Sequence, residues 1–425
     1  MTPVLSPAVA LRVFLTLTVT RWFPVGLVVG ILTLWPLERG LSVPEALTAT
    51  SLTGITVFLL ELPTSGFADA FGRRPVYVTA ALFLLASAVV FYTATAWWQF
   101  ALAAILTGVF RALDSGPLEA WFVDTVHASD PGADVDRALA RQGVVLGTAM
   151  AAGALLSGGL VWWHPIASQS ALLLPGLLYL GMGVVHLGAV LILLKEPERR
   201  GAAGAVGVRR AAASVHEAPV VIREGLALLR HNRVLGGVVA VELFWSAGMV
   251  VFETFQPIRL SELLGSKDAA AAIMGPVASA GWGLFAVGSA LAAVGSRRLG
   301  VARMAILARV LNGLGAVVMG LVAGPVALIV AYAVTYTVHG AAGPVHSALL
   351  HREASARNRS TVLSINSMVS FLGFSLTAAL AGQLAAHTST PLAMVALGAF
   401  SVLGAVFYLP AMRAERAPER ALVSR

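Results

Sequence analysis

The sequence predicts an all-α membrane protein with twelve transmembrane helices in two pseudo-symmetric six-helix bundles and both termini in the cytoplasm. Three observations support this fold class: the composition, the number of long apolar stretches, and the placing of basic residues between them. Of the 425 residues, 58% are hydrophobic and only 12% are charged, whereas about 25% of the residues of an ordinary soluble domain are charged. A chain with so little polar surface is expected to have lipid as its main solvent.

Twelve apolar stretches are long enough to cross a bilayer, whose hydrocarbon core of roughly 30 Å needs about 20 residues of helix. They lie near residues 13–36, 46–69, 76–95, 98–123, 138–163, 171–194, 234–258, 270–294, 302–322, 325–350, 360–386 and 391–411.

The longest interruption runs over residues 195–233 and separates six stretches from six. We therefore expect an N-terminal six-helix bundle (1–194), a cytoplasmic linker (195–233), and a C-terminal six-helix bundle with a cytoplasmic tail (234–425). Within the linker, residues 218–230 are a candidate for a short amphipathic helix on the membrane surface.

Basic residues predict the orientation. With the N-terminus inside, the inner loops and the tail hold 22 lysines and arginines, and the outer loops hold 3. This asymmetry follows the positive-inside rule. It also accounts for the net charge of +8, so we expect no nucleic-acid partner. The chain has no cysteine, which excludes disulfides and thiolate metal sites.

The two halves resemble one another. Phe71-Gly72-Arg73-Arg74 follows the second stretch, and Leu299-Gly300-Val301-Ala302-Arg303 follows the eighth. A parallel duplication of six-helix units would place a substrate path between the halves, near the bilayer midplane.

A compact motif lies in the short loop between the second and third stretches. Its glycines permit a tight turn, and its acid lies near two arginines. The motif residues are Gly66, Asp69, Gly72, Arg73 and Arg74. They match position for position the loop signature Gly-x-x-x-Asp-x-x-Gly-Arg-Arg/Lys of the major facilitator superfamily, which the chain resembles.

The resemblance implies a fold, a role for the motif and a function. The fold is twelve helices in two bundles, and the loop latches the cytoplasmic ends of the halves, with its arginine engaging Asp124 at the end of helix four. The second-half copy of the loop has lost the acid, so we expect a weaker latch there. The motif and the glycine-rich fifth stretch are most similar to those of drug/proton antiporter-type exporters.

Ionisable residues inside apolar stretches are costly and are usually paired or functional. Glu61 precedes a proline in the second stretch, and it is either a proton carrier or a structural partner of Arg21 or Arg111. Arg111 and Asp114 are three residues apart on one helix face. They either neutralise each other, or Asp114 takes up a proton and frees the arginine.

The seventh stretch carries a polar stripe. Glu242, Ser246, Met249, Glu253 and Gln256 follow one another at i, i+4, i+7, i+11 and i+14, which is one face of a regular α-helix. Such a stripe would face the central cavity, and two carboxylates on it suit proton coupling or a cationic substrate. The alternative is a pair of buried, neutral acids held by hydrogen bonds.

Two histidines lie seven residues apart on one face of the tenth stretch. Histidine titrates near neutral pH, which suits a proton relay, and His339 is the candidate. His346 lies near the cytoplasmic end, and we expect it to be solvated. His186 is alone in its stretch, and we expect it to be a hydrogen-bonded structural residue. No third ligand has the spacing of a metal site, so no metal or other cofactor is expected.

These interpretations give two groups of candidates. Those for proton coupling are Glu61, Arg111, Asp114, Glu242, Glu253 and His339. Those for the substrate cavity are Arg21, Trp245, Ser246, Met249, Gln256 and Asn366.

The expected function is secondary active transport of a small organic molecule, lipophilic or cationic, across the plasma (inner) membrane. We expect a monomer that works by alternating access as a proton-coupled exporter (drug or metabolite:H⁺ antiport). The alternatives are a proton symporter or uniporter for a nutrient or metabolite, and a non-transporting membrane sensor on the same fold. An enzyme is not expected, because the sequence has no Gly-x-x-x-x-Gly-Lys-Ser/Thr loop and no His-Glu-x-x-His motif.

Overall fold

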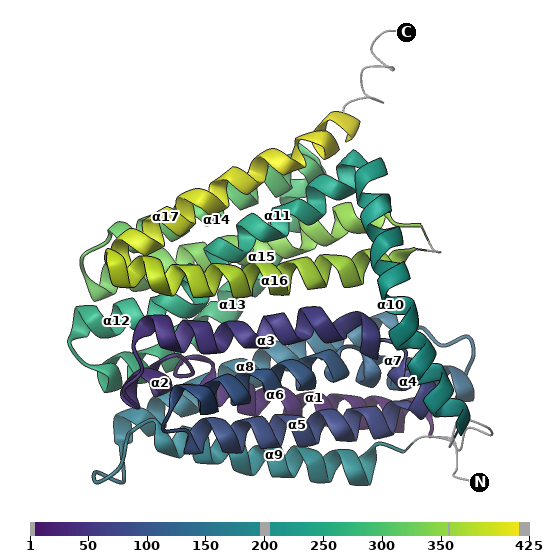
Figure 1. Cartoon of the computed structure of the whole chain (residues 1–425), viewed down its shortest axis with the longest axis horizontal. Helices are drawn as coiled ribbons and strands as arrows, with labels where there is room; N and C mark the ends of the chain where they lie inside the picture. Colours follow the sequence, from purple (N-terminus) through teal and green to yellow (C-terminus); the bar gives the residue numbers. More distant parts are fainter. Residues whose placement is uncertain (1–4, 196–204, 356–357, 416–425) are drawn as a thin grey trace. The chain divides into compact units, whose positions relative to one another are not determined.

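The computed structural model describes residues 5–195, 205–355 and 358–415. Every regular element in this part of the chain is helical, and twelve segments are long and apolar enough to cross a membrane (Figure 1). The predicted fold class and number of spans are therefore confirmed.

Nine of the twelve spans are single helices. In chain order they are α1 (Pro7–Val29), α3 (Val43–Thr64), α5 (Arg73–Thr93), α8 (Asp136–Trp163), α9 (Leu173–Leu193), α13 (Lys267–Leu299), α14 (Val301–Leu321), α15 (Pro325–Glu353) and α16 (Arg359–His387).

Three spans change helix type or break along their length. The fourth consists of α6 (Trp97–Asp114) and α7 (Pro117–Ser129), separated by Gly116 with φ +93°. The break falls in the sequence Ser115-Gly116-Pro117. The seventh consists of α11 (Arg233–Met249), the π-helical η1 (Val250–Phe255) and α12 (Gln256–Leu264). The twelfth consists of α17 (Thr390–Leu403), the 3₁₀-helical η2 (Gly404–Tyr408) and further helix to Glu415.

Three short or peripheral helices complete the chain. The first span is displaced from the predicted 13–36, because α1 ends at Val29 and α2 (Leu34–Glu38) is a separate helix. The second span ends at Thr64 instead of 69, and α4 (Phe67–Phe71) follows it. Between α9 and α11 lies α10 (Ala205–His231), which is longer than the predicted helix at 218–230.

The chain forms two compact units that do not coincide with its sequence halves. Unit 1 consists of Met1–Trp35, Leu59–Ala218 and Ala271–Ser279, and unit 2 of Pro36–Phe58, Pro219–Ala270 and Ala280–Arg425. Each half thus gives one piece of a span to the other unit. The predicted division into six-helix bundles at 1–194 and 234–425, with a cytoplasmic linker at 195–233, remains a prediction.

Close backbone packing explains the two exchanged pieces. In unit 2, a Cβ on Gly54 of α3 would lie 2.6 Å from the Phe371 carbonyl oxygen of α16. In unit 1, a Cβ on Gly158 of α8 would lie 2.9 Å from the Gly275 Cα of α13. Only glycine allows helices to approach so closely. The second span thus packs on the eleventh and the eighth on the fifth, which are equivalent pairs under a six-span repeat.

The repeat also appears in backbone geometry. Gly72 has φ 100° and ψ 156°, and Gly300 has φ 84° and ψ 156°. Each precedes the first residue of a span, and the two glycines are 228 positions apart. Because residues with side chains rarely adopt this conformation, the two loops share one local structure, as the sequence comparison predicted.

Each unit has its own apolar core. In unit 1, Phe14 of α1 stacks on Phe122 of α7 at 4.4 Å, and the buried Trp121 donates a hydrogen bond to the Lys195 carbonyl. In unit 2, Val238, Val241 and Leu349 pack around the fully buried Tyr408. This second core surrounds a group of polar side chains, described next.

Candidate functional site

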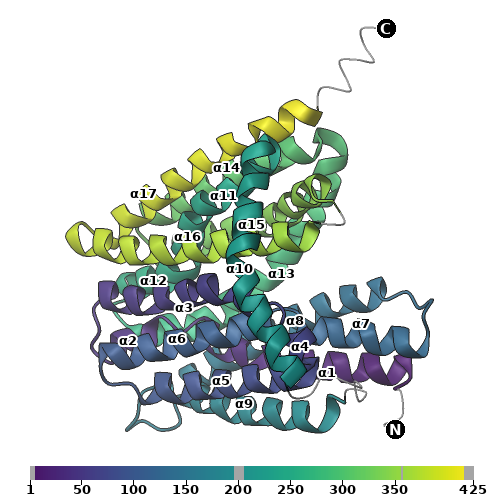
Figure 2. The same cartoon turned by 45° about the vertical axis from the view of Figure 1, so that its right-hand side comes forward.

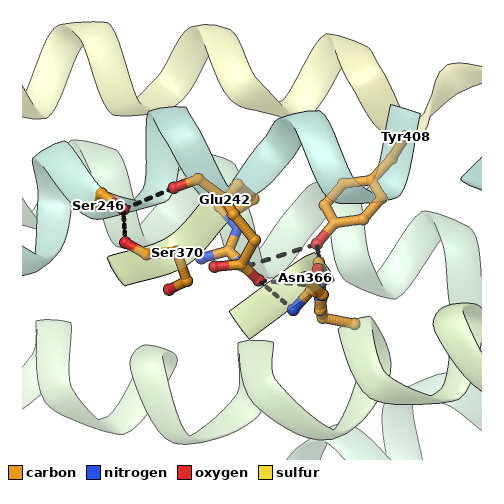
Figure 3. Close-up of polar contacts among 7 residues, drawn as sticks. Glu242, Ser246, Asn366, Ser370 and Tyr408 are labelled. Carbon is orange, nitrogen blue, oxygen red and sulfur yellow. Dashed lines mark hydrogen bonds and ion pairs between the residues drawn. The ribbon is translucent and has the colours of Figure 1, made fainter. Parts of the chain in front are cut away.

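Unit 2 contains a buried polar group that we call the His346 network. It consists of Glu242 (α11), Arg309 (α14), His346 (α15), Asn366 (α16) and Tyr408 (η2), one residue from each of five elements (Figure 3). At its centre, His346 Nε2 lies 2.8 Å from Glu242 Oε1, and His346 Nδ1 lies 2.7 Å from the Tyr408 hydroxyl. Four residues of the network are at most 5% exposed; only Asn366 is half-buried.

Donor and acceptor chemistry gives the network a direction. A guanidinium can only donate, so Arg309 Nη2 donates to the Tyr408 oxygen at 3.4 Å. When the imidazole is neutral with its proton on Nε2, the Tyr408 hydroxyl donates to His346 Nδ1 and His346 Nε2 donates to Glu242. A protonated imidazole instead donates through both nitrogens. Asn366 Nδ2 also donates to Glu242 Oε1, at 3.4 Å. The result is a hydrogen-bond chain from a permanent cation, through an imidazole, to a carboxylate.

The network is incompletely satisfied. Glu242 Oε2 and the Arg309 atoms Nε and Nη1 are buried and have no hydrogen-bond partner among the described residues. Buried polar groups normally have partners, and exceptions call for an explanation. A proton, an ordered water or a bound ligand could each supply such a partner.

Aromatic side chains cover one side of the network. The Arg309 guanidinium lies over the Trp245 ring at 4.7 Å, and Trp245 stacks on His339 at 5.3 Å. Phe252 and Phe285 pack against the same histidine at 4.9 and 5.4 Å. Trp245 Nε1 and His339 Nδ1 are buried without a hydrogen-bond partner in the described chain. The cavity candidate Trp245 thus links Arg309 to the proton-coupling candidate His339.

The predicted stripe on the seventh span is interrupted. Glu242 and Ser246 lie on α11, where the Ser246 hydroxyl donates to the backbone carbonyls of Glu242 and Ser370 (Figure 3). Glu253 lies within η1, whose i→i+5 hydrogen bonds change the number of residues per helical turn. The prediction of one continuous α-helical face from Glu242 to Gln256 is therefore wrong. Met249 precedes this change and is half-buried.

The last two residues of the predicted stripe, Glu253 and Gln256, have different neighbours from Glu242. Glu253 is hydrogen-bonded to Tyr336 and lies near Tyr332 of α15. Gln256 is fully buried, and neither of its amide atoms has a hydrogen-bond partner among the described residues. The two acids of the stripe therefore have different surroundings: histidine and asparagine for Glu242, tyrosines for Glu253.

Unit 1 contains a simpler charged group, the α1–α6 ion pair. Arg21 Nη2 and Nε lie 3.1 and 3.2 Å from Asp114 Oδ2. The guanidinium also lies over the rings of Trp22 and Phe110, at 4.8 and 4.4 Å. The sequence suggested Arg111 as the neighbour of Asp114, and its charge does act on that carboxylate. The 3.1 Å contact, however, comes from Arg21, 93 positions away. Local spacing could not indicate Arg21, because this contact comes from the packing of α1 on α6.

The surroundings of this pair account for two further candidates. Thr20 Oγ1 and the buried His186 Nδ1 are 2.9 Å apart, so His186 is hydrogen-bonded, as expected from the sequence. A small cavity beside Arg21 is lined by both and by Tyr179. Glu61 is half-buried and makes no hydrogen bond or ion pair within the described chain. Pairing of Glu61 with Arg21 is therefore wrong, and its role as a proton carrier remains a prediction.

The loop motif forms the contact that the family resemblance implies. Arg73 Nη2 lies 3.1 Å from Asp124 Oδ2, and Arg74 Nη2 donates to the Leu191 carbonyl at 2.8 Å. Gly66 precedes α4, and the Asp69 side chain lies outside the described residues. The role of these residues as a latch remains a prediction.

The loop around Gly300, which has no acid of its own, is contacted by an acid from another element. Glu415, at the end of the twelfth span, pairs with Arg352 of α15 and accepts a hydrogen bond from the Ala302 backbone N–H at 3.1 Å. Arg352 stands 228 positions after Asp124, the same offset that separates Gly72 from Gly300. The charge at the equivalent position has been inverted, and the acid now comes from the last span.

Sequence reasoning missed three residues of the His346 network. His346 was expected to be solvated, which is wrong: α15 continues to Glu353, and the imidazole is 5% exposed. Arg309 had a detectable signal, since an arginine within an apolar stretch is rare without a function. Tyr408 had none, because an aromatic residue near the end of a span is ordinary.

Among the described residues, no group of three or more histidine, aspartate or glutamate side chains is arranged to hold a metal ion. The His346 network therefore consists of proton donors and acceptors beside aromatic rings.

Comparisons with known proteins agree with this architecture. The crystal structure of the nucleoside transporter NupG (D323A mutant) matches with a TM-score of 0.74 and 12% identity over 95% of this chain and 99% of that one. A POT family transporter in complex with 5-aminolevulinic acid matches with a TM-score of 0.67 and 14% identity, over 96% of both chains. No curated protein matches the sequence significantly. The Major Facilitator Superfamily profile matches residues 14–350 and 286–424, and the chain belongs to this superfamily of membrane transporters.

Proposed function

We propose that the chain is a proton-coupled exporter of a small organic molecule, and that the Glu242–His346 pair carries the coupled proton. Its family supports secondary transport in general. The observation that carries the finer proposal is the 2.8 Å contact between a carboxylate and an imidazole that are 2% and 5% exposed. Both groups can take up and release a proton, whereas a guanidinium stays protonated.

Protonation of Glu242 would change the packing of three helices. The carboxylate accepts from His346 on α15 and from Asn366 on α16, and it belongs to α11. A neutral acid is a weaker acceptor than a carboxylate, so its protonation loosens both contacts. A ligand or proton drives a conformational change only through such a difference in interaction between two states. Alternating access between inward-open and outward-open states is the change that we propose it biases.

The nature of the substrate is supported by the same region. Glu242 and Glu253 supply negative charge, and the rings of Trp245, Phe252 and Phe285 supply apolar and π surface. Cations are attracted to aromatic faces as well as to carboxylates. We therefore propose a lipophilic cation as the substrate, in keeping with efflux across the plasma membrane by a monomer.

The direction of transport rests on the resemblance to antiporter-type exporters in the loop motif and the glycine-rich fifth span. A proton symporter or uniporter is the competing proposal. The solved structures with the same fold are titled as nucleoside and peptide transporters, but at 12–15% identity they support the fold alone. A non-transporting sensor is a weaker proposal, because it gives no reason for the buried acids.

The test is transport into proteoliposomes with an imposed pH gradient. The compounds are a permanently charged lipophilic cation, a neutral lipophile, a nucleoside and a dipeptide; a permanent charge avoids trapping of a weak base. Antiport accumulates substrate in an acidic lumen, symport accumulates it in an alkaline lumen, and uniport responds to neither. Protein-free liposomes give the background.

Two variants test the proton carrier. Glu242→Gln and His346→Gln should lose gradient-driven accumulation while retaining exchange of substrate at equal pH. Glu217→Gln, an exposed acid on α10, is the matched control and should behave as the parent chain. Full proton coupling in both network variants would contradict the assignment, and absence of gradient-driven flux in a correctly inserted parent chain would remove proton coupling altogether.

A further inference from the structure

The helix α10 has a surface that the transport proposal does not use. It runs unbroken from Ala205 to His231, with Pro219 inside, and it is not among the twelve candidate spans (Figures 1 and 2). The C-terminal end is joined to α11, a membrane span, by the single residue Asn232. One end of α10 is therefore held at a boundary of the membrane.

One face of α10 packs on protein through small residues. Ala211, Ala218 and Gly225 recur every seven positions and are buried. Beside them, the Ser214 hydroxyl donates to the Pro63 carbonyl at the end of α3. A Cβ on Gly225 would meet the Ile365 side chain of α16. This face of α10 therefore contacts other parts of the protein and is not available to a further partner.

The neighbouring face is apolar and uncovered. Val208, Val215, Ile222 and Leu226 fall within about 40° of one another at 100° per residue. Their exposed fractions are 61, 46, 37 and 49%. Large apolar side chains gathered on one exposed face indicate an interaction surface.

Charged residues divide the rest of the helix by sign. Arg209, Arg223 and Arg230 follow next around the helix from the apolar stripe, and all three are exposed. Glu217 and Glu224 lie on the opposite side from the stripe, about 160–180° away at 100° per residue. The order around the helix is protein contact, apolar stripe, basic row and acidic row. Helices that lie in a membrane surface have this arrangement, with basic residues at the headgroups.

We propose that α10 lies in the headgroup region of the bilayer, with its stripe in the acyl-chain boundary and its three arginines on the phosphates of anionic lipids. The occupant is lipid and not a protein, because the helix is tethered one residue from a span and its basic row adjoins the stripe. Asn232 fixes this junction: its side chain accepts from the Val234 and Leu235 N–H groups and donates to Glu353 Oε2 at 2.7 Å.

The test uses the absence of cysteine from the chain. Single-cysteine variants Val215→Cys and Ile222→Cys report on the stripe, and Glu217→Cys and Glu224→Cys report on the opposite side. Each is labelled with a small environment-sensitive fluorophore and reconstituted into vesicles of phosphatidylglycerol and phosphatidylethanolamine. Quenchers attached high on lipid acyl chains are compared with iodide in the water.

We expect lipid-borne quenchers to quench the stripe labels several-fold more than the acidic-side labels, and iodide to give the reverse order. Equal iodide quenching on both sides would overturn the proposal. Stripe labels that are equally protected from iodide in lipid-free amphipol would also overturn it, since protein would then cover the stripe.

The arginines are tested separately. The triple variant Arg209→Gln, Arg223→Gln, Arg230→Gln should lose most of the blue shift that phosphatidylglycerol adds to the Val215→Cys label relative to phosphatidylcholine. Arg210→Gln, on another side of the helix, is the matched control and should keep it. An unchanged lipid response in the triple variant would contradict the role of the basic row. Neither measurement depends on transport, so the result is independent of the proposed function.

Discussion

Each unit contains a buried arginine that lies over a tryptophan ring, but the two arginines have different hydrogen-bond partners. In unit 1, Arg21 lies over Trp22 and pairs directly with Asp114. In unit 2, Arg309 lies over Trp245 and donates to Tyr408, and the carboxylate of Glu242 is held by His346 instead. The first is a direct ion pair, while the second inserts a phenol and an imidazole between the charges.

This difference separates a structural role from a switching role. A guanidinium stays charged at any physiological pH, so the α1–α6 ion pair can be broken only by protonating its acid against an adjacent cation. The His346 network contains an imidazole whose charge can change. We therefore expect the ion pair to contribute mainly to stability and the network mainly to coupling, and the following changes would break or sharpen that contrast.

The largest effect on stability is expected from Asp114→Asn. It leaves the Arg21 guanidinium buried without its anion, and removing one partner of a buried pair costs about 3–5 kcal/mol. Thermal unfolding in detergent, followed by tryptophan fluorescence, measures the loss. The double variant Arg21→Gln, Asp114→Asn should recover part of it, because no uncompensated charge remains. Proton coupling in the surviving protein should be intact; its loss would make the ion pair part of the proton path.

A smaller loss of stability, with a larger loss of coupling, is expected from His346→Gln. The amide can replace one hydrogen bond of the imidazole, so we expect a cost of about 1–3 kcal/mol for the group left unsatisfied. The dependence of exchange rate on pH between 5.5 and 8 should flatten, because no titratable group links Tyr408 to Glu242. A pH profile identical to that of the parent chain would show that the imidazole does not titrate during transport.

Tyr408→Phe should have a milder effect on both properties. The phenyl ring keeps the packing of the buried core, while Arg309 loses an acceptor and His346 Nδ1 loses its partner. We expect a loss of about 1–2 kcal/mol and a shifted pH profile instead of a flat one. The variant Tyr92→Phe, at a buried tyrosine of unit 1 outside the network, is the control and should leave the profile unchanged.

The spans were predictable from sequence because the length of an apolar run is a local property. The break after Asp114 was also predictable, since Ser115-Gly116-Pro117 combines two helix breakers. The π-helical segment was not, because Val250–Phe255 contains no glycine or proline. The sequence therefore predicted a single polar stripe where the structure has two environments.

The candidate site was only partly predictable, because its partners are far apart in sequence. Glu242 was identified from its place in an apolar span, but its neighbours His346 and Asn366 follow 104 and 124 positions later. Asp114 was identified in the same way, but the sequence did not indicate its closest partner, Arg21. Position in a span indicates that an ionisable residue needs a partner; only helix packing determines which one.

The smallest effects are expected in the two loops that the repeat relates. The Asp124 side chain is 52% exposed and that of Arg352 is 51% exposed, and exposed ion pairs contribute about 0–1 kcal/mol. Asp124→Asn and Glu415→Gln should therefore leave unfolding nearly unchanged. A latch nevertheless acts on the balance between two conformations, so a few tenths of a kcal/mol shifts their populations measurably.

We expect Asp124→Asn to change the rate of exchange about two- to threefold, since this ratio corresponds to about 0.4–0.7 kcal/mol. Glu415→Gln should have a similar effect if the loop around Gly300 also acts as a latch, because Glu415 accepts the Ala302 N–H of that loop. Spin labels on engineered cysteine pairs, one on each side of the loop, would measure the populations. If Asp124→Asn shifts them and Glu415→Gln does not, the latch belongs to the first loop alone, and the acid at Glu415 only caps α14.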